Sequence, residues 1–198
     1  IIDNIYQFIK ENKGKECVAY QNIDSVTEDQ KDRIKYDRIF NGNRRHKNKI
    51  IRELSIKIYY KLLSIQKKLK INRLKNNQLE IRKGANWFSI TDDLANYLLT
   101  KREEIAKTYK FTNCADEIFL QTITYNSKFK NKIYNEYSDE HQNIKRYIDW
   151  NRGQPYVFSI NDYEELINSE CFFARKFSSQ KDKDIIDKTA KMIQDITR

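Results

Sequence analysis

Segments with helical apolar spacing alternate along this chain with short apolar runs, and this alternation restricts the fold more than any other feature. Residues 1–12 have the three- and four-residue apolar spacing of an amphipathic helix, and Gly14 follows where a helix end favours a left-handed residue. The next run, residues 17–20, is short and apolar, as in a buried strand. Helices that alternate with short strands predict an α/β or α+β layered domain rather than a helical bundle.

The same alternation continues through the second half of the chain. Residues 86–90 predict a strand, and Thr91 is placed to cap a helix whose first turn holds Asp92 and Asp93. Residues 113–127 predict another helix. The remaining predicted elements are a strand at 146–148, a turn at 151–155, a strand at 156–159 and a helix from Asn161.

The segment 47–75 differs from the rest because it combines an apolar stripe with a heavily basic face. The stripe consists of Ile51, Leu54, Ile58, Leu62, Ile65 and Leu69. The basic residues are Lys49, Arg52, Lys57, Lys61, Lys67, Lys68 and Lys70. Glu53 is the single acid opposing them. Two interpretations stay open, a packed helix with a solvated basic face or a helix lying on an anionic membrane surface.

Length and composition indicate one folded domain over residues 1–198. The charged fraction of 33% is too high for a membrane-embedded chain. The aromatic fraction of 13% is too high for a disordered chain. No apolar run approaches the roughly 20 residues that a spanning helix needs. Three cysteines in unrelated contexts lack metal-site spacing, so we expect reduced thiols in a cytoplasmic protein.

Four sequence blocks carry a resemblance to a known family. They are Lys83–Thr91, Ala115–Thr122, Arg146–Trp150 and Phe172–Phe177. In this order and spacing they resemble family 14 glycosyltransferases, the core-2/I-branching and xylosyltransferase group, and especially its bacterial members. The resemblance covers residues 1–178. It implies the C-terminal part of a catalytic domain with the glycosyltransferase-A, Rossmann-like α/β fold.

The implied fold has a mixed sheet flanked by helices, with 47–75 as a basic helical insertion. In the family, the first strands and much of the base-binding site precede the region where this chain starts. The sequence is therefore expected to lack the N-terminal part of the family's domain.

The resemblance also assigns chemical roles. Inverting transfer needs a general base within hydrogen-bond reach of the acceptor hydroxyl. The family pattern puts this role on Glu117, with Asp116 beside it; without that pattern, both acids would be read as capping a surface helix. The departing nucleoside diphosphate needs fixed positive charge. Lys176 matches the family's phosphate-contacting lysine, and Arg175 is the weaker candidate because neighbouring residues usually point apart.

A second phosphate-binding cation is less directly assigned. An alignment without gaps, counted back from Lys176, places Gly153 where the family has an arginine. Arg152 and Arg146 are the candidate substitutes. This departure raises the hypothesis of a degenerate transferase, which would bind a partner without catalysis.

Aromatic and metal-binding candidates complete the expected site. Trp87 is expected to line the pocket by stacking on a sugar face, and Trp150 is a second candidate. The literal Asp-x-Asp motif, Asp182–Asp184, lies among lysines that disfavour a dication. We therefore expect no metal site, no cofactor and metal-independent transfer, as the resemblance implies.

The resemblance implies an inverting glycosyltransferase that moves N-acetylglucosamine or xylose from a UDP-sugar donor to a glycan or lipid-linked glycan. Surface polysaccharide synthesis at the cytoplasmic face of a membrane is the expected setting, with peripheral contact to anionic lipid. The net charge of +10 raises a nucleic-acid-binding module as an alternative. No nucleic-acid partner is expected, because the basic residues lack aromatic interleaving or a recognisable binding motif. A degenerate transferase that binds without catalysis is the remaining alternative.

Overall fold

The computed structural model describes residues 2–73, 78–135 and 140–196, which form two compact units. Each unit is assembled from segments that are separated in the sequence. The first unit comprises Ile1–Ala19, Trp87–Thr91 and Asn131–Arg198, and the second comprises Tyr20–Asn86 and Asp92–Lys130. The single domain expected over 1–198 thus contains two compact parts.

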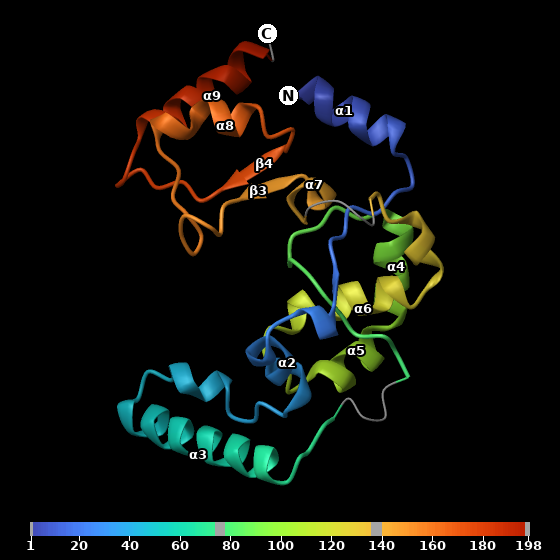
Figure 1. The fold of residues 1–198 in the computed structure, drawn as a ribbon, viewed down its shortest axis with the longest axis vertical. Coiled ribbons are helices and arrows are strands. Elements are labelled where there is room, and N and C mark those ends of the chain that lie inside the picture. Colours follow the sequence, from blue (N-terminus) through green and yellow to red (C-terminus); the bar gives the residue numbers. More distant parts are fainter. Residues whose placement is uncertain (1, 74–77, 136–139, 197–198) are drawn as a thin grey trace. The chain divides into compact units, whose positions relative to one another are not determined.

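The first unit places helices around a short parallel pair of strands (Figure 1). Its helices are α1 (Ile2–Glu11), α7 (Glu140–Ile144), the 3-10 turn η5 (Ile160–Asp162), α8 (Tyr163–Ile167) and α9 (Asp184–Ile196). Its strands are β3 (Arg146–Ile148) and β4 (Phe173–Arg175), paired in register from Arg146 with Phe173 to Ile148 with Arg175. Phe158, Ile148 and Ile185 are buried, and Phe158 packs against the rings of Tyr147 and Phe177.

The second unit is mostly helical. Its elements are β1 (Gln21–Asn22), η1 (Ile23–Ser25), α2 (Glu28–Lys35), η2 (Gly42–Arg45), α3 (Lys49–Lys68), β2 (Arg82–Lys83), α4 (Asp92–Thr100), α5 (Arg102–Tyr109), η3 (Ala115–Glu117) and α6 (Phe119–Tyr125); the turn η4 (Lys128–Lys132) runs on into the first unit. The strands β1 and β2 are antiparallel. Ile34, Ile81, Tyr109 and Ile118 form the buried centre of this unit.

Several predicted elements are confirmed. The helix over 1–12 is α1, Gly14 has a φ of 81°, α4 begins directly after Thr91, and β3 coincides with the strand predicted at 146–148. The mixed α/β composition is also confirmed. Apolar spacing therefore located α1 correctly, whereas the helix α9 was not predicted.

The predicted strands at 17–20, 86–90 and 156–159 are wrong, and the single mixed sheet is replaced, in the described residues, by two sheets of two strands. Residues 17–19 are buried, but Cys17 makes only an isolated bridge to Ser89. At Phe88 a side chain takes the place of a neighbouring strand, because the Phe88 carbonyl accepts from the Arg146 guanidinium. Backbone groups satisfied in this way have no need of a strand partner.

The helix predicted over 113–127 is divided. The 3-10 turn η3 is followed by α6, and the chain leaves helical geometry at Ile118, where φ is −134°. Ile118 is almost fully buried in the centre of the second unit. The break lies directly after Glu117, so this residue ends a turn and does not lie inside a helix.

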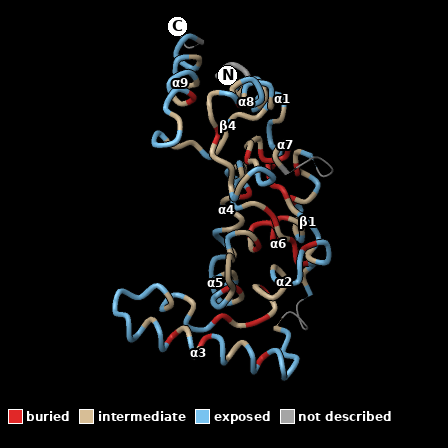
Figure 2. Tube along the Cα trace, turned by 60° about the vertical axis from the view of Figure 1, so that its left-hand side comes forward, coloured by how far each residue is buried: buried red, intermediate tan, exposed pale blue. Residues whose placement is uncertain are grey.

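The basic segment forms α3, which is shorter than the predicted 47–75; Leu74 and Lys75 lie outside the described residues. Its buried residues are Ser55, Tyr59 and Gln66, whereas Leu54 and Leu69 of the predicted stripe are exposed (Figure 2). The stripe is therefore not the packed face of this helix. Among the described residues, no helix is both long and apolar enough to cross a bilayer, and the three cysteines are free.

Candidate functional site

The residues singled out in the sequence fall into two groups, one in each unit. Asp116 and Glu117 belong to the second unit. The first unit contains Trp87, Arg146, Arg152, Arg175 and Lys176. The first sequence block, residues 83–91, contributes to both units.

Glu117 ends the turn η3, which begins after Cys114 in the left-handed conformation with a φ of 56°. Its carboxylate pairs with the Lys83 ammonium at 3.1 Å, and the two side chains are 29% and 17% exposed. Asp116 is more exposed, and its carboxylate accepts a hydrogen bond of 2.8 Å from the Asn86 amide. A carboxylate that is partly open and fixed by one cation can still approach a hydroxyl group from its open side.

The main chain around Glu117 is also held in place. The Gly84 N–H donates to the Glu117 carbonyl at 2.9 Å. One turn further along, the buried Gln121 amide donates to the Ala85 carbonyl at 2.7 Å. The segment 83–86 therefore fixes both the backbone and the carboxylate of Glu117, as a catalytic base would require.

Lys83 and Asn86 were not among the residues predicted from the sequence. Each contacts one of the two candidate acids, across more than 25 positions of sequence. A signal was present, because both lie in the same block as Trp87. Spacing alone could not identify them, since it does not reveal which block faces which.

Trp87, Arg146 and Arg175 come together in the first unit. The Arg146 and Arg175 guanidinium carbons lie 5.7 Å and 5.2 Å from the Trp87 ring centroid. Arg146 donates to the carbonyls of Ile144 and Phe88 at 2.8 Å and 3.1 Å, and burial lowers its pKa. Most of its donors are thus used to hold the chain around β3.

Lys176 is held by its backbone and exposes its side chain. Its N–H donates to the Tyr156 carbonyl at 3.2 Å, and its carbonyl accepts from the Phe158 N–H at 2.9 Å. Within the described residues, the side chains of Lys176 and Arg175 make no hydrogen bond or ion pair. These two cations are therefore available for an anionic ligand.

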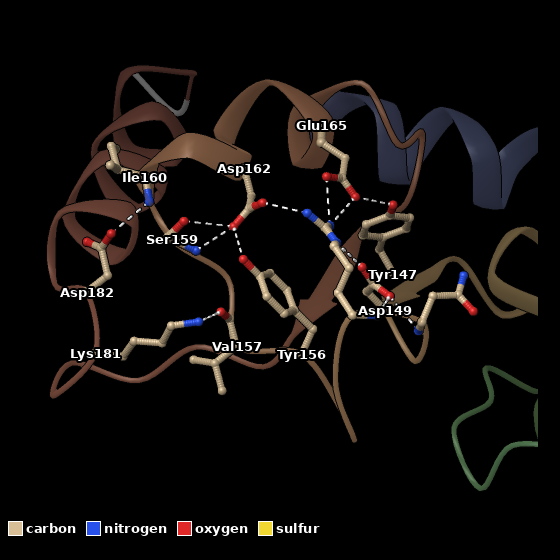
Figure 3. A network of polar contacts seen from close by, with 12 residues as sticks. Tyr147, Asp149, Tyr156, Val157, Ser159, Ile160, Asp162, Glu165, Lys181 and Asp182 are labelled. Carbon is tan, nitrogen blue, oxygen red and sulfur yellow. Dashed lines mark hydrogen bonds and ion pairs between the residues drawn. The ribbon is translucent and has the colours of Figure 1, made fainter.

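The guanidinium of Arg152, unlike the side chains of Lys176 and Arg175, is already occupied, because three carboxylates surround it (Figure 3). Its guanidinium contacts Asp149, Asp162 at 2.8 Å and both oxygens of Glu165 at 2.7 Å and 2.8 Å. The hydrogen bond to Asp149 contributes most to raising the pKa of Arg152. A phosphate could engage this guanidinium only by displacing these carboxylates.

Glu165 also accepts a hydrogen bond from the phenol of Tyr147. This bond, together with burial, raises the pKa of Tyr147 to about 12. Tyr147, Arg152 and Glu165 line a polar cavity of about 610 Å³ together with Trp150, which is 52% exposed. Trp150 is thus accessible to a ligand, as stacking on a sugar would require.

Gly153 follows Arg152 in the turn that links β3 to the extended segment 156–158. A Cβ atom at this position would lie 2.7 Å from the Tyr156 Cα and 2.9 Å from the Tyr156 nitrogen. No side chain fits there without a backbone shift. The backbone geometry therefore favours glycine at position 153, where the resemblance of the sequence leads us to expect an arginine.

The Asp-x-Asp segment has a structural role in the first unit. Asp182 accepts from the Ile160 N–H at 2.8 Å and from the Asp184 N–H at 2.9 Å, at the start of α9. In the part of the chain that the structure describes, no group of three or more His, Cys, Asp or Glu residues is arranged to hold a metal ion.

Comparison with known proteins adds one finding. A family model described as Core-2/I-Branching enzyme matches residues 14–169. The matched range contains the first three sequence blocks with Glu117, whereas Arg175 and Lys176 follow it. No curated protein matches the chain.

Proposed function

Because the chain belongs to the Core-2/I-branching enzyme family, a family of glycosyltransferases, we propose that it transfers a sugar from a UDP-sugar donor to a glycan hydroxyl with inversion. The pairing of Glu117 with Lys83, inside the matched range, carries this proposal. N-acetylglucosamine and xylose are the proposed donor sugars, because the sequence resemblance implies them. The acceptor is a glycan or a lipid-linked glycan.

Glu117 is the general base of this reaction. Its carboxylate takes the proton of the acceptor hydroxyl while that oxygen forms a bond to the anomeric carbon. The bond from the anomeric carbon to the UDP oxygen breaks at the same time, which inverts the configuration. Lys83 is a positioning residue, because its ammonium fixes the carboxylate at 3.1 Å. Asp116, bound to Asn86, supports the same turn.

Lys176 and Arg175 stabilise the departing diphosphate. Both are cations without a bond to other described side chains, so binding an anion breaks no internal ion pair. Arg146 orients Trp87 and the chain around β3, whereas Arg152 maintains its own carboxylate cluster. With two lysine or arginine charges at the leaving group, the transfer proceeds without a metal ion or cofactor.

The test measures transfer and hydrolysis from a panel of UDP-sugars in the presence of EDTA. Glu117→Gln is expected to lower kcat by roughly 10²- to 10⁴-fold, the usual contribution of general-base catalysis. Lys176→Ala should lower turnover of the same donor. Selective turnover in EDTA that both substitutions abolish supports the proposal.

Lys83 needs a readout that separates positioning from folding. Lys83→Met should lower kcat by roughly tenfold with little change in KM, since a misplaced base costs rate more than binding. Lys83→Arg should restore most of that loss. Lys101→Met is a matched control, because it breaks the exposed 2.9 Å pair with Glu104 in the same unit.

Three results would contradict this proposal. Full activity in Glu117→Gln would place the base elsewhere, and activity that EDTA abolishes would require a metal. Binding of a UDP-sugar without any turnover, across a range of glycan acceptors, would instead identify a degenerate transferase.

A further inference from the structure

The helix α3 presents a face on which apolar and basic side chains alternate. Ile50 is 76% exposed and Leu54 is 57% exposed, values unusual for such residues in a packed helix. Positions spaced by three and four residues share one side of a helix. By this spacing, the face contains Ile50, Leu54, Lys57, Lys61, Ile65 and Lys68.

The opposite side of α3 anchors it to its own unit. Tyr59 accepts a hydrogen bond of 2.8 Å from Arg38, and Gln66 bonds both the N–H and the carbonyl of Asp37 at 2.9 Å and 3.0 Å. Tyr59 and Gln66 are both buried. These contacts fix the orientation of α3 in its unit. The exposed apolar and basic face therefore belongs to a packed helix, and its exposure does not result from fraying of the helix ends (Figure 2).

Positive charge is concentrated around this face. Residues 42–70 contain ten lysines and arginines and one acid, Glu53. Among the described residues, no ion pair involves Lys57, Lys61 or Lys68. Among these described residues, their charge is therefore not compensated by an acidic partner.

We propose that this face of α3 binds the surface of an anionic lipid bilayer. Interfacial helices place apolar side chains below the headgroups and basic ones at the level of the lipid phosphates. Ile50, Leu54 and Ile65 provide the first contact, and the long stems of the intervening lysines can extend to the phosphates. Anionic lipids are concentrated in the cytoplasmic leaflet of cell membranes, so this is the surface at which we place the protein.

Charge and chemistry favour this occupant over others. A nucleic acid would use the lysines but would leave the exposed isoleucines and Leu54 in contact with phosphate or water. A second copy of the chain would bring two faces with the same high positive charge together. An anionic bilayer satisfies both features of the face, and this inference does not depend on the proposed transferase activity.

Vesicle flotation tests the inference with the full chain. The vesicles contain phosphatidylcholine alone or with about one third phosphatidylglycerol. Two triple variants test the two features of the face. The lysine variant combines Lys57→Gln, Lys61→Gln and Lys68→Gln. The apolar variant combines Ile50→Ser, Leu54→Ser and Ile65→Ser. The matched control removes the same charge from exposed lysines on other helices, Lys10→Gln with Lys107→Gln and Lys191→Gln.

The protein should bind the anionic vesicles and not the neutral ones. The α3 lysine variant should lose roughly 100-fold in partitioning at low salt, because each of the three lysines near the surface contributes about fivefold. The apolar variant should lose at least about tenfold through lost burial of methylene groups. The control variant should lose less than either, and circular dichroism should be unchanged in all three.

Other outcomes would overturn the inference. Equal binding to neutral vesicles, or an equal loss in the control variant, would mean that the α3 charges have no specific role. Full binding by the apolar variant would mean that net charge alone accounts for vesicle binding. No vesicle binding, with salt-dependent binding to an oligonucleotide or a dimer in light scattering, would assign the face to a nucleic acid or to a second copy.

Discussion

Gly153 shows how one residue can determine which cations are possible in a site. Its Cα approaches the backbone of Tyr156 so closely that an added Cβ would lie 2.7 Å from the Tyr156 Cα. The same turn directs Arg152 towards Asp149, Asp162 and Glu165. An arginine at position 153 would therefore require a different turn, so a second cation for the proposed diphosphate has to come from another position.

We expect Gly153→Ala to lower the free energy of unfolding by about 1–3 kcal/mol, the usual cost of forcing extra atoms into a filled space. Urea denaturation followed by far-ultraviolet circular dichroism, which reports on the helices of both units, measures this change. Gly42→Ala is the matched control, because no heavy atom lies within 4 Å of its added Cβ. Equal effects at the two glycines would contradict the steric explanation.

At the scale of elements, α6 uses its side chains to support the chain segment 80–86. Asn126 bonds both backbone groups of Glu80, and the buried Thr122 hydroxyl accepts from the Arg82 N–H at 3.1 Å and donates to the Arg82 carbonyl at 3.2 Å. This ladder continues to the segment that holds Glu117. Its loss should therefore reduce stability and disturb the candidate base together.

Thr122→Val tests this ladder, because it keeps the side-chain shape and removes both hydrogen bonds. It should lower the free energy of unfolding by about 1–3 kcal/mol, since the Arg82 backbone groups lose their buried partner. Thr124→Val is the control: Thr124 is equally buried, and its hydroxyl has no hydrogen-bond partner in the described residues. Thermal denaturation should show no loss, or a gain, for Thr124→Val. A larger loss there than at Thr122 would reject the ladder.

Contacts between residues distant in sequence also decide which elements could be predicted from the sequence. The helices α1, α3 and α4 follow from apolar spacing, because amphipathic helices are encoded locally. The strands expected at 17–20 and 86–90 failed, because their backbone groups meet single partners distant in sequence: Cys17 and Ser89 bond each other, and the Phe88 carbonyl accepts from Arg146. A local pattern contains no information about such partners.

The candidate site was predictable to a similar extent. Family resemblance pointed to Glu117 and Lys176, and these roles stay predictions. The partner of Glu117 was not visible, because Lys83 lies 34 positions away and its pairing depends on the fold. The occupation of Arg152 by three carboxylates was equally hidden, since Asp162 and Glu165 come from the next helical segments.

For the whole molecule, the acids with lowered pKa values gather mainly in the first unit. The Arg152 N–H and guanidinium lower the pKa of Asp149, and the Ile160 N–H lowers that of Asp182. Burial raises the pKa of Asp162, but hydrogen bonds from Ser159 and Arg152 outweigh it and leave the pKa lowered. Both tryptophans, Trp87 and Trp150, belong to this unit, so tryptophan emission reports on it.

These shifts determine the direction of acid sensitivity. The ordinary aspartate pKa is 3.8, and the folded-state values lie below it. The stabilisation is therefore fully present above this value and is lost as the pH falls through the folded values. Urea unfolding, followed by tryptophan emission, should show a stable unit at neutral pH and a steep loss below about pH 4.

Arg152→Gln should make this dependence weaker, because it removes the cation that favours the ionised carboxylates. The variant should be clearly less stable than the wild type at neutral pH, with the difference reduced by more than about half once the carboxylates are protonated. Lys183→Gln is the control, since it breaks an exposed 3.3 Å pair with Asp187 in the same unit and should have little effect at any pH. A difference independent of pH would mean that Arg152 acts by packing over the Tyr156 ring, 4.4 Å away, and not through its carboxylates.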